Sequence, residues 1–238
     1  MDLKEEAILG QDVDRHWYYR SKASALCRYC NDVEPSLVLD VGAGSGFFTK
    51  HLLRYTNAQA GLCVDPGYDV DSDEQYSGKR LQFRRSCGTV AADTVLLMDV
   101  LEHVEDDRAL LLEYVTKVPK GARFLITVPA FDWLWSSHDV FLGHYRRYCL
   151  GELERVVSGV GLRVERASYY FGFVLPLAGV MRMSESLRPD AKRSPQSNLR
   201  RHSRLVNGAL TLICRAELPL LPRNRLGGLS VFCLAHKL

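Results

Sequence analysis

The sequence predicts an α/β fold built on a parallel β-sheet, and two observations lead to that prediction. First, short apolar runs alternate with helix-like stretches from residue 36 to about 168, which is the pattern of successive β-α-β units. Second, the first apolar run leads into glycines at positions 42, 44 and 46, a loop that must turn sharply and let a ligand approach its backbone. A chain of 238 residues is long enough for one such domain with a sizeable core.

The apolar runs define the expected strands. Five candidate strands lie at 36–41, 60–65, 81–86, 93–99 and 122–128, and two more, at 162–169 and 229–237, are closer to alternating patterns. Helices are expected between them at 47–55, 107–118 and 150–160. The last of these has apolar residues near the 3.6-residue period of a helix. The order of the segments fits β-α-β units joined in one sheet.

Two regions lie outside this alternation. Residues 1–31 form a leader with a helical patch at 17–30, and residues 170–227 form an insertion too long for a simple connection. The insertion contains a polar, basic, proline-containing stretch at 186–204, which we expect to be an exposed connector. We predict one domain over 1–238, with lid helices (1–31), a core (36–168), a helical cap (170–227) and a last strand (228–238).

Composition limits the class of protein. Hydrophobic residues make up 47% and charged residues 25%, as in soluble globular proteins. The net charge of +3 is too small to predict a nucleic-acid partner. The acidic start is unlike a signal peptide, and seven cysteines, an odd number, do not predict a disulfide framework. Cys27 and Cys30 form a C-x-x-C pair, but no second such pair and no pair of histidines lies at the spacing of a zinc finger. We therefore expect a cytoplasmic protein.

The longest uncharged run, residues 167–181, is too short to span a bilayer and is interrupted by Pro176. Three interpretations remain open for it: a core segment, a lid over an apolar substrate, or a segment lying on a membrane surface.

The glycine loop carries an aspartate at its mouth. Asp40 precedes it, where a carboxylate would repel a pyrophosphate and attract an ammonium group. The G-x-G-x-G spacing also differs from the G-x-G-x-x-G of dinucleotide sites. Asp65 ends the second predicted strand, where an acidic side chain can accept hydrogen bonds from a ribose. These residues predict a nucleoside ligand that carries a positive charge.

Four motifs in order, VLDVGAGSGFF, CVDP, LLMDVLEHVEDD and FLITVP, resemble those of class I S-adenosylmethionine-dependent methyltransferases over residues 36–168. The resemblance implies a doubly wound, seven-stranded Rossmann-like sheet whose antiparallel last strand is LSVFCLAHK. It implies S-adenosylmethionine as cofactor. The cofactor residues would be Asp40, Gly42, Gly44 and Gly46 at the methionine end, Asp65 and Pro66 at the ribose, and Met98 and Asp99 at the fourth strand. Cys87 or Gly88 would stand beside the adenine, where such proteins often have an acidic or polar residue.

An acidic-histidine cluster follows the fourth strand. If a helix begins at Asp99, then Asp99, Glu102 and His103 share one face near the methyl end of the cofactor. In one interpretation Glu102 and His103 shape and polarise the pocket. In the other they bind a divalent metal with a later histidine, His138 or His144, as some relatives of this class do. Many relatives with the same Leu-Glu-His-Val stretch hold no metal, and we therefore expect none here.

The segment after the fifth strand is rich in aromatic and basic residues, and it predicts an acceptor pocket. We expect His144 to take a proton, with Tyr145, His103 and Glu102 as further catalytic residues. The residues expected to bind the acceptor are Trp135, His138 and Arg146. The resemblance of HWYYRSK to such methyltransferases suggests that His16, Trp17 and Arg20 form a lid helix over cofactor and acceptor. From the residues alone, Trp17, Tyr18 and Tyr19 equally suit a helix docked on the sheet. The alternative is structural: Trp133 and Trp135 in the core, and Arg146 and Arg147 solvated or paired with Glu152 and Glu154.

HDVFLGHYRRY, together with HWYYRSK, resembles a bacterial subgroup of these methyltransferases often associated with envelope-lipid, polysaccharide or secondary-metabolite pathways. We therefore predict methyl transfer to a small-molecule or lipid- or saccharide-linked acceptor at oxygen, with no nucleic acid as partner. Peripheral contact with the inner membrane surface through 168–183 fits this acceptor. The alternatives are an RNA or protein methyltransferase and a non-catalytic regulator that binds the cofactor.

Overall fold

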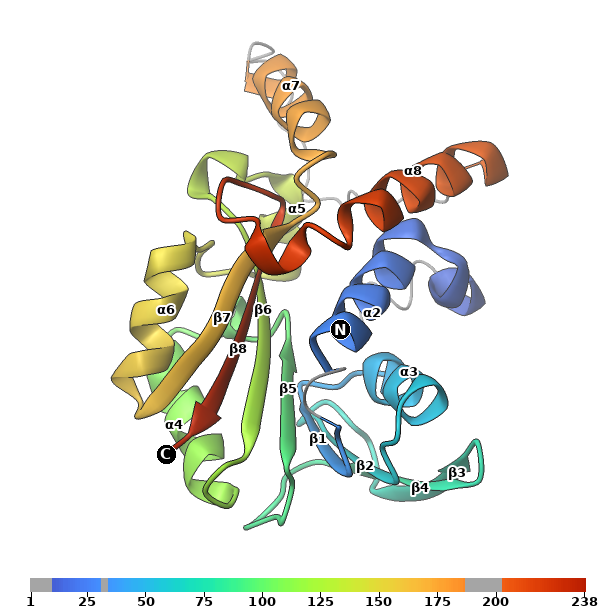
Figure 1. The fold of residues 1–238 in the computed structure, drawn as a ribbon, viewed down its shortest axis with the longest axis vertical. Coiled ribbons are helices and arrows are strands. Elements are labelled where there is room, and N and C mark those ends of the chain that lie inside the picture. Colours follow the sequence, from blue (N-terminus) through green and yellow to red (C-terminus); the bar gives the residue numbers. More distant parts are fainter. Residues whose placement is uncertain (1–9, 31–33, 187–202) are drawn as a thin grey trace.

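A single eight-stranded sheet organises the chain in the computed structural model, which describes residues 10–30, 34–186 and 203–238. The strand order is β3-β4-β2-β1-β5-β6-β8-β7 (Figure 1). The strands are β1 (Leu37–Val41), β2 (Ala60–Val64), β3 (Ser72–Tyr76), β4 (Lys79–Arg84), β5 (Thr94–Met98), β6 (Arg123–Pro129), β7 (Leu162–Tyr170) and β8 (Ser230–Lys237). The predicted α/β fold is confirmed.

The last strand is reversed, as predicted. β8 lies between β6 and β7 and pairs antiparallel with both, while β1, β2, β4, β5 and β6 are parallel to one another. The carboxyl ends of these parallel strands therefore meet at one edge of the sheet, the edge at which α/β folds bind ligands.

The sheet has one strand more than the seven expected. β3 forms an antiparallel hairpin with β4 through Ser77 and Gly78, whose φ angles are 53° and 75°. The polar sequence SDEQY of β3 gives no apolar run to predict it, because the strand lies at the sheet edge and is mostly exposed. The hairpin turn also sets the start of β4 at Lys79, and the strand ends at Arg84, two residues before the predicted end at residue 86.

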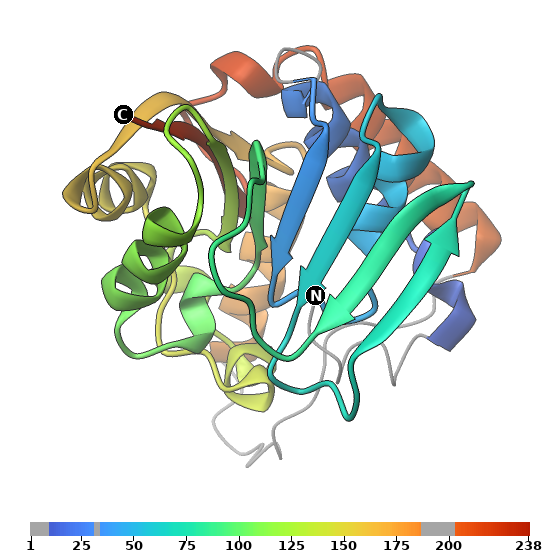
Figure 2. The same ribbon diagram turned by 90° about the horizontal axis from the view of Figure 1, so that it is seen from below.

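Helices cover both faces of the sheet (Figure 2). On one face α2 (Trp17–Cys30) and α3 (Phe47–Tyr55) pack with α8 (Arg204–Glu217), and on the other α4 (Asp107–Lys117) packs with α6 (Leu150–Gly159). The short helices are η1 (Gly10–Arg15), η2 (Leu101–His103), η3 (Asp132–Leu134), α5 (Ser137–Leu142) and η4 (Leu221–Arg223). The two hydrophobic clusters lie on opposite sides of the sheet, each under its own helices.

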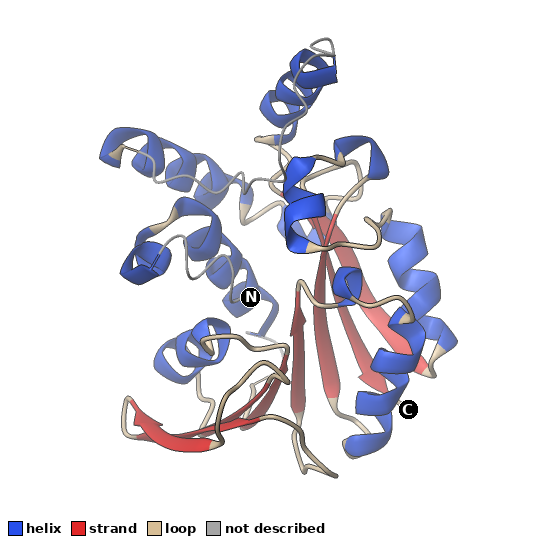
Figure 3. Cartoon of the chain, turned by 180° about the vertical axis from the view of Figure 1, so that it is seen from behind, coloured by secondary structure: helices blue, strands red, loops and turns tan. Residues whose placement is uncertain are grey.

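The insertion between β7 and β8 is helical in its described part. α7 (Leu175–Ser186) extends away from the sheet, whereas α8 lies against α2 (Figure 3). Asn207 of α8 accepts a hydrogen bond from the Trp17 amide at 2.8 Å. Most of the predicted basic connector lies outside the described residues, at 187–202. Among the helices of the described ranges, none has the length and hydropathy needed to cross a bilayer.

Candidate functional site

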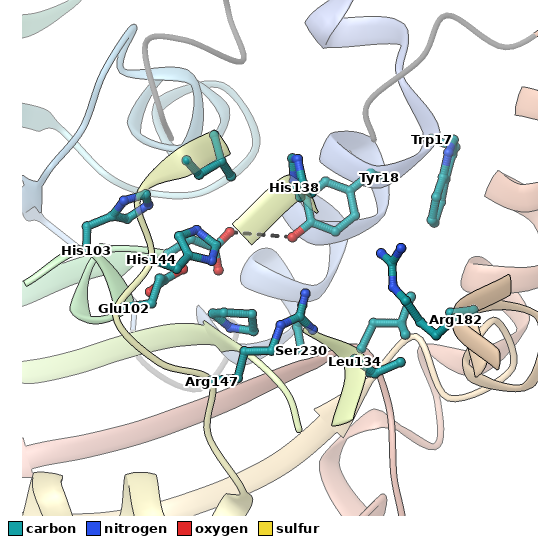
Figure 4. A pocket seen from close by; sticks show the side chains of 15 residues that line it. Trp17, Tyr18, Glu102, His103, Leu134, His138, His144, Arg147, Arg182 and Ser230 are labelled. Carbon is teal, nitrogen blue, oxygen red and sulfur yellow. Dashed lines mark hydrogen bonds between the residues drawn. The ribbon is translucent and has the colours of Figure 1, made fainter. Parts of the chain in front are cut away.

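Two adjoining cavities open at the carboxyl edge of the sheet. The larger, about 490 Å³, lies beside the glycine loop and the ends of β1, β2, β4 and β5. The smaller, about 220 Å³, lies beneath α2 and the segment that follows β6 (Figure 4). Asp99 and His103 line both cavities. A group held in one cavity can therefore reach a group held in the other at these two residues.

The glycine loop borders the larger cavity through Gly42, while Gly44 and Gly46 do not line it. Gly42 has φ +63°, and a Cβ there would lie 2.9 Å from a Val100 methyl group. Gly46 has φ +70° and caps α3, and a Cβ there would lie 3.0 Å from Cys63 Sγ. Both positions combine a left-handed backbone with close neighbours, which only glycine tolerates well. The loop therefore presents bare backbone to a ligand.

Asp65 closes the loop and faces the larger cavity. Its Oδ2 accepts a hydrogen bond from the Gly44 amide at 3.0 Å, and its Oδ1 accepts one from the Gly67 amide at 2.8 Å. Pro66 lines the same cavity. The carboxylate is thereby fixed at the end of β2, with lone pairs left for a ligand.

Two of the predicted cofactor residues lie beneath this surface. Asp40 is 1% exposed, accepts a hydrogen bond from the Thr49 hydroxyl at 2.7 Å and does not line the cavity. Burial raises the pKa of Asp40 to about 6. Met98 is also buried. Beyond β4, Arg85 and Ser86 line the cavity rather than Cys87 or Gly88, because that strand ends two residues early.

The chain leaves β5 through a strained residue. Asp99 has φ +57°, and its amide donates to the Thr127 carbonyl oxygen at 3.0 Å, so no helix begins there. The expected helix from Asp99 is wrong: Glu102 and His103 lie in the single 3₁₀ turn η2, and α4 begins at Asp107. A left-handed aspartate persists only when its surroundings hold it, and such residues cluster at functional sites.

The Asp99 side chain is paired with a buried lysine of α2. Lys22 of α2, 0% exposed, forms an ion pair with Asp99 Oδ2, and its Nζ lies 3.2 Å from the Tyr18 hydroxyl. Burial alone would raise the pKa of Asp99, but the Lys22 ammonium outweighs it and lowers that pKa. α2 thus contributes a charge directly to the residue shared by both cavities.

Glu102 faces the smaller cavity from η2. Its side chain is buried, and its Oε2 atom has no hydrogen-bond partner among the described residues. Burial, and then the charge of Asp99, raise the pKa of Glu102 well above its usual range. The Glu102 carbonyl oxygen accepts the Tyr145 amide at 2.7 Å, which ties η2 to the loop after α5.

That loop carries an oriented histidine. His144 Nδ1 lies 2.9 Å from Asp139 Oδ1, and Arg147 donates to both oxygens of Asp139 at 2.7 and 3.0 Å. The Ser136 amide also donates to Asp139, as part of the capping box of α5. Burial would raise the pKa of Asp139, but the bonds from His144 and Arg147 hold it well below its usual range. Asp139 is therefore a fixed carboxylate that directs the other ring nitrogen, Nε2, elsewhere.

The His144 ring lies beside His103, with centroids 4.6 Å apart and planes at 87°. One ligand atom from each of Glu102, His103 and His144 can be chosen so that all three lie within 4.8 Å of one another. Figure 4 shows these three side chains together at one end of the smaller cavity, with Trp17 and Arg182 at the other.

The structure brings part of the predicted acceptor set to the smaller cavity. Trp17 and His138 line it together with His103, Glu102 and His144. Four predicted residues do not: Arg20, Trp135, Tyr145 and Arg146. Tyr145 is 57% exposed, and Arg146 pairs with Asp107 at 3.2 Å.

Several residues of this cavity were missed by sequence reasoning. Tyr18, Arg147 and Arg182 line it, while Lys22 and Asp139 support it from behind. Lys22 and Tyr18 belong to the aromatic and basic motif HWYYRSK, and this motif is the sequence feature that could have predicted their place at the site. A helix of that sequence must bury some of its polar groups.

Comparisons with known proteins bear on the family and the fold of the chain. The family model described as "Methyltransferase domain" matches residues 15–167. No curated protein shows a significant match to the sequence.

Among solved structures, a chain of the complex between the Haloferax volcanii Trm112 methyltransferase activator and a methyltransferase is 16% identical. It has a TM-score of 0.58, with 95% of this chain and 92% of that one covered. An S-adenosylmethionine-dependent methyltransferase from Archaeoglobus fulgidus is 18% identical, with a TM-score of 0.53 and 90% and 92% covered. Phosphoethanolamine N-methyltransferase 2 of Haemonchus contortus is 14% identical, with a TM-score of 0.52 and 90% and 52% covered. At these identities the likeness is one of fold.

Proposed function

This chain belongs to the methyltransferase-domain family and is an S-adenosylmethionine-dependent class I enzyme. From that premise we propose that it methylates a hydroxyl group. The acceptor would be a small molecule or a lipid- or saccharide-linked compound. The observation that supports this proposal is the meeting of two cavities at Asp99 and His103. Methyl transfer needs donor and acceptor aligned in one line at short distance, which two adjoining cavities provide.

The larger cavity suits the cofactor. Its bare glycine loop accepts close approach of a ligand, and the Asp65 carboxylate stands where ribose hydroxyls can donate to it. Asp40 supports the loop from beneath through Thr49. When bound, the cofactor supplies a methyl group already activated by the sulfonium, so the chain's residues chiefly bind and orient.

The smaller cavity suits an acceptor with a hydroxyl group. Oxygen attacks a methyl group efficiently only when its proton is lost, and Glu102, His103 and His144 are polar groups next to the cofactor cavity that can favour this loss. Two aromatic side chains of α2, Trp17 and Tyr18, also line this cavity and can bury a ring or a sugar face.

Changing Asp65 to alanine tests the cofactor half of the proposal. The loss of charged hydrogen bonds to the ribose is expected to cost about 1.5–3 kcal/mol, or roughly 10- to 150-fold in affinity. Calorimetry with S-adenosylhomocysteine measures it. Asp69→Ala, at an exposed position in the same loop between β2 and β3, is the matched control and should bind as the parent does. Equal affinity of Asp65→Ala and the parent would contradict the assignment.

The surface of α7 supports an apolar or lipid-linked acceptor. Ala178 and Arg182 of this helix line the smaller cavity, while Leu177, Val180 and Met181 are more than half exposed. An apolar helix face beside the acceptor cavity, with an arginine among its residues, fits contact with an anionic membrane surface.

The double change Leu177→Asp and Val180→Asp is expected to reduce flotation with phosphatidylglycerol-containing liposomes at least tenfold. Each inserted apolar side chain contributes roughly 1.5–3 kcal/mol, and the added charges repel the surface. Leu112→Asp, a similarly exposed leucine on α4, is the control and should float as the parent does. If the double variant floats equally well, α7 makes no membrane contact.

A further inference from the structure

Glu102, His103 and His144 bring a carboxylate and two imidazoles together between the two cavities. We propose that these three side chains bind one divalent cation of the zinc type between the cofactor and acceptor cavities. Glu102 and His103 come from η2, and His144 comes from the loop after α5. The Tyr145-to-Glu102 backbone hydrogen bond joins the two segments, so the three side chains are held together by the fold.

The separation of the donor atoms suits a cation. One donor from each residue lies within 4.8 Å of the other two. A tetrahedral ion with bonds of about 2.0–2.2 Å needs donors roughly 3.4 Å apart. Small side-chain rotations cover this difference.

Glu102 supplies the observation that points to a ligand. Its carboxyl group is 1% exposed, and its Oε2 atom is buried without a hydrogen-bond partner in the described residues. A buried carboxylate oxygen left unpaired is costly, whereas a bound cation would satisfy it. The group lines the smaller cavity, so the ion can enter from there.

His144 has the outer-shell support typical of a metal ligand. Asp139, a buried carboxylate, binds Nδ1 at 2.9 Å and leaves Nε2 as the nitrogen for coordination. Arg147 and the Ser136 amide hold Asp139 in turn. A carboxylate on the far nitrogen fixes the tautomer and orientation of a ligating histidine. The same geometry selects His144 over His138 as the later histidine.

The donor set indicates which cation would bind. Two imidazoles and one carboxylate suit Zn²⁺, Co²⁺ or Ni²⁺ better than Mg²⁺ or Ca²⁺, which prefer oxygen ligands. Three protein ligands leave at least one position open toward the acceptor cavity.

The catalytic consequence rests on the proposed function. An acceptor hydroxyl on the open position would have a lowered pKa and would release its proton to solvent. Its oxygen then forms the new bond to the methyl carbon as the carbon–sulfur bond breaks and leaves a neutral thioether. In this arrangement His144 is a ligand and takes no proton itself.

Titration of the chelator-stripped full-length protein tests the site without any acceptor. Calorimetry with ZnCl₂ and absorption spectra with CoCl₂ should show one cation per chain, with the visible bands of a nitrogen- and oxygen-ligated cobalt ion. Glu102→Gln and His103→Asn should each weaken binding at least tenfold. His138→Asn, a histidine in the same cavity but outside the cluster, should leave the affinity unchanged.

Two results would overturn the proposal: no binding at one equivalent, or binding that Glu102→Gln and His103→Asn leave unchanged. Binding of S-adenosylhomocysteine to the stripped protein is measured in parallel. If it persists while the cation fails to bind, the cation site is refuted and the methyltransferase assignment is unaffected. If the cation binds but no hydroxyl acceptor is methylated, the result supports the cation site and contradicts the proposed methylation at oxygen.

Discussion

Replacement of His144 by alanine should lower turnover about 10²- to 10⁴-fold while leaving the affinity for S-adenosylhomocysteine within about twofold. The residue lines the acceptor cavity and not the cofactor cavity, so its loss removes only a contact on the acceptor side. The effect is large because the acceptor oxygen then keeps its proton. Single-turnover rates with labelled cofactor, together with calorimetry, measure the two quantities separately.

Asp139→Asn provides a graded companion to this change. The asparagine keeps the shape but removes the charge that orients the His144 ring, so turnover should fall less than in His144→Ala. His236→Ala is the control, since His236 lies on β8 and bonds to Glu165 away from both cavities. Loss of cofactor affinity in His144→Ala would move this residue to the cofactor side. Unchanged turnover would remove it from the reaction.

The sheet was largely predictable because its central strands are buried on both faces. Strands such as β1 and β5 read as continuous apolar runs, and the glycines at 42 and 46 mark the turn that follows the first of them. The edge strand β3 was missed for the same physical reason, because it is exposed and polar and is stabilised by pairing with β4. Apolar runs in the sequence mark strands that are buried, and an exposed edge strand such as β3 has no such run.

The sequence predicted which types of residue form the site better than it predicted the directions in which their side chains point. The sequence indicates that His144 and Arg146 lie near the acceptor, but Arg146 turns toward Asp107, 39 positions earlier, while the neighbouring Arg147 turns inward to Asp139. Such choices depend on partners from other elements. The left-handed backbone of Asp99 likewise depends on Thr127 and Lys22, 28 and 77 positions away, and therefore leaves no local signal.

The Lys22–Asp99 pair is expected to be costly to break. Lys22→Met leaves the Asp99 carboxylate without its cation. Loss of one partner of a fully buried pair costs about 3–5 kcal/mol, and because the Asp99 side chain is 26% exposed we expect the lower end, about 3 kcal/mol. For a domain of this size that corresponds to a fall in Tm of roughly 6–12 °C. Lys117→Met, which removes an exposed pair with Glu113 on α4, should cost only about 0.5 kcal/mol.

The pH dependence of this loss follows from the two pKa shifts. The pKa of Asp99 is lowered on folding, so its contribution is complete above its unfolded pKa of about 4 and is lost as pH falls through the lowered value. Burial alone would lower the pKa of Lys22, but Asp99 raises it, so that contribution is complete below about 10.4 and is lost at higher pH. The stability difference between parent and Lys22→Met should therefore be flat from about pH 5 to 10 and should narrow on the acid side.

Urea unfolding of four proteins, the parent, Lys22→Met, Asp99→Asn and the double variant, separates the pair from its parts. The double variant should recover much of the loss, because the asparagine removes the unpaired charge. If the two single losses simply add, Lys22 and Asp99 do not interact in the folded protein. In that case α2 is held without this ion pair, by its apolar packing on Phe47 and Phe171 and by its hydrogen bond to Asn207.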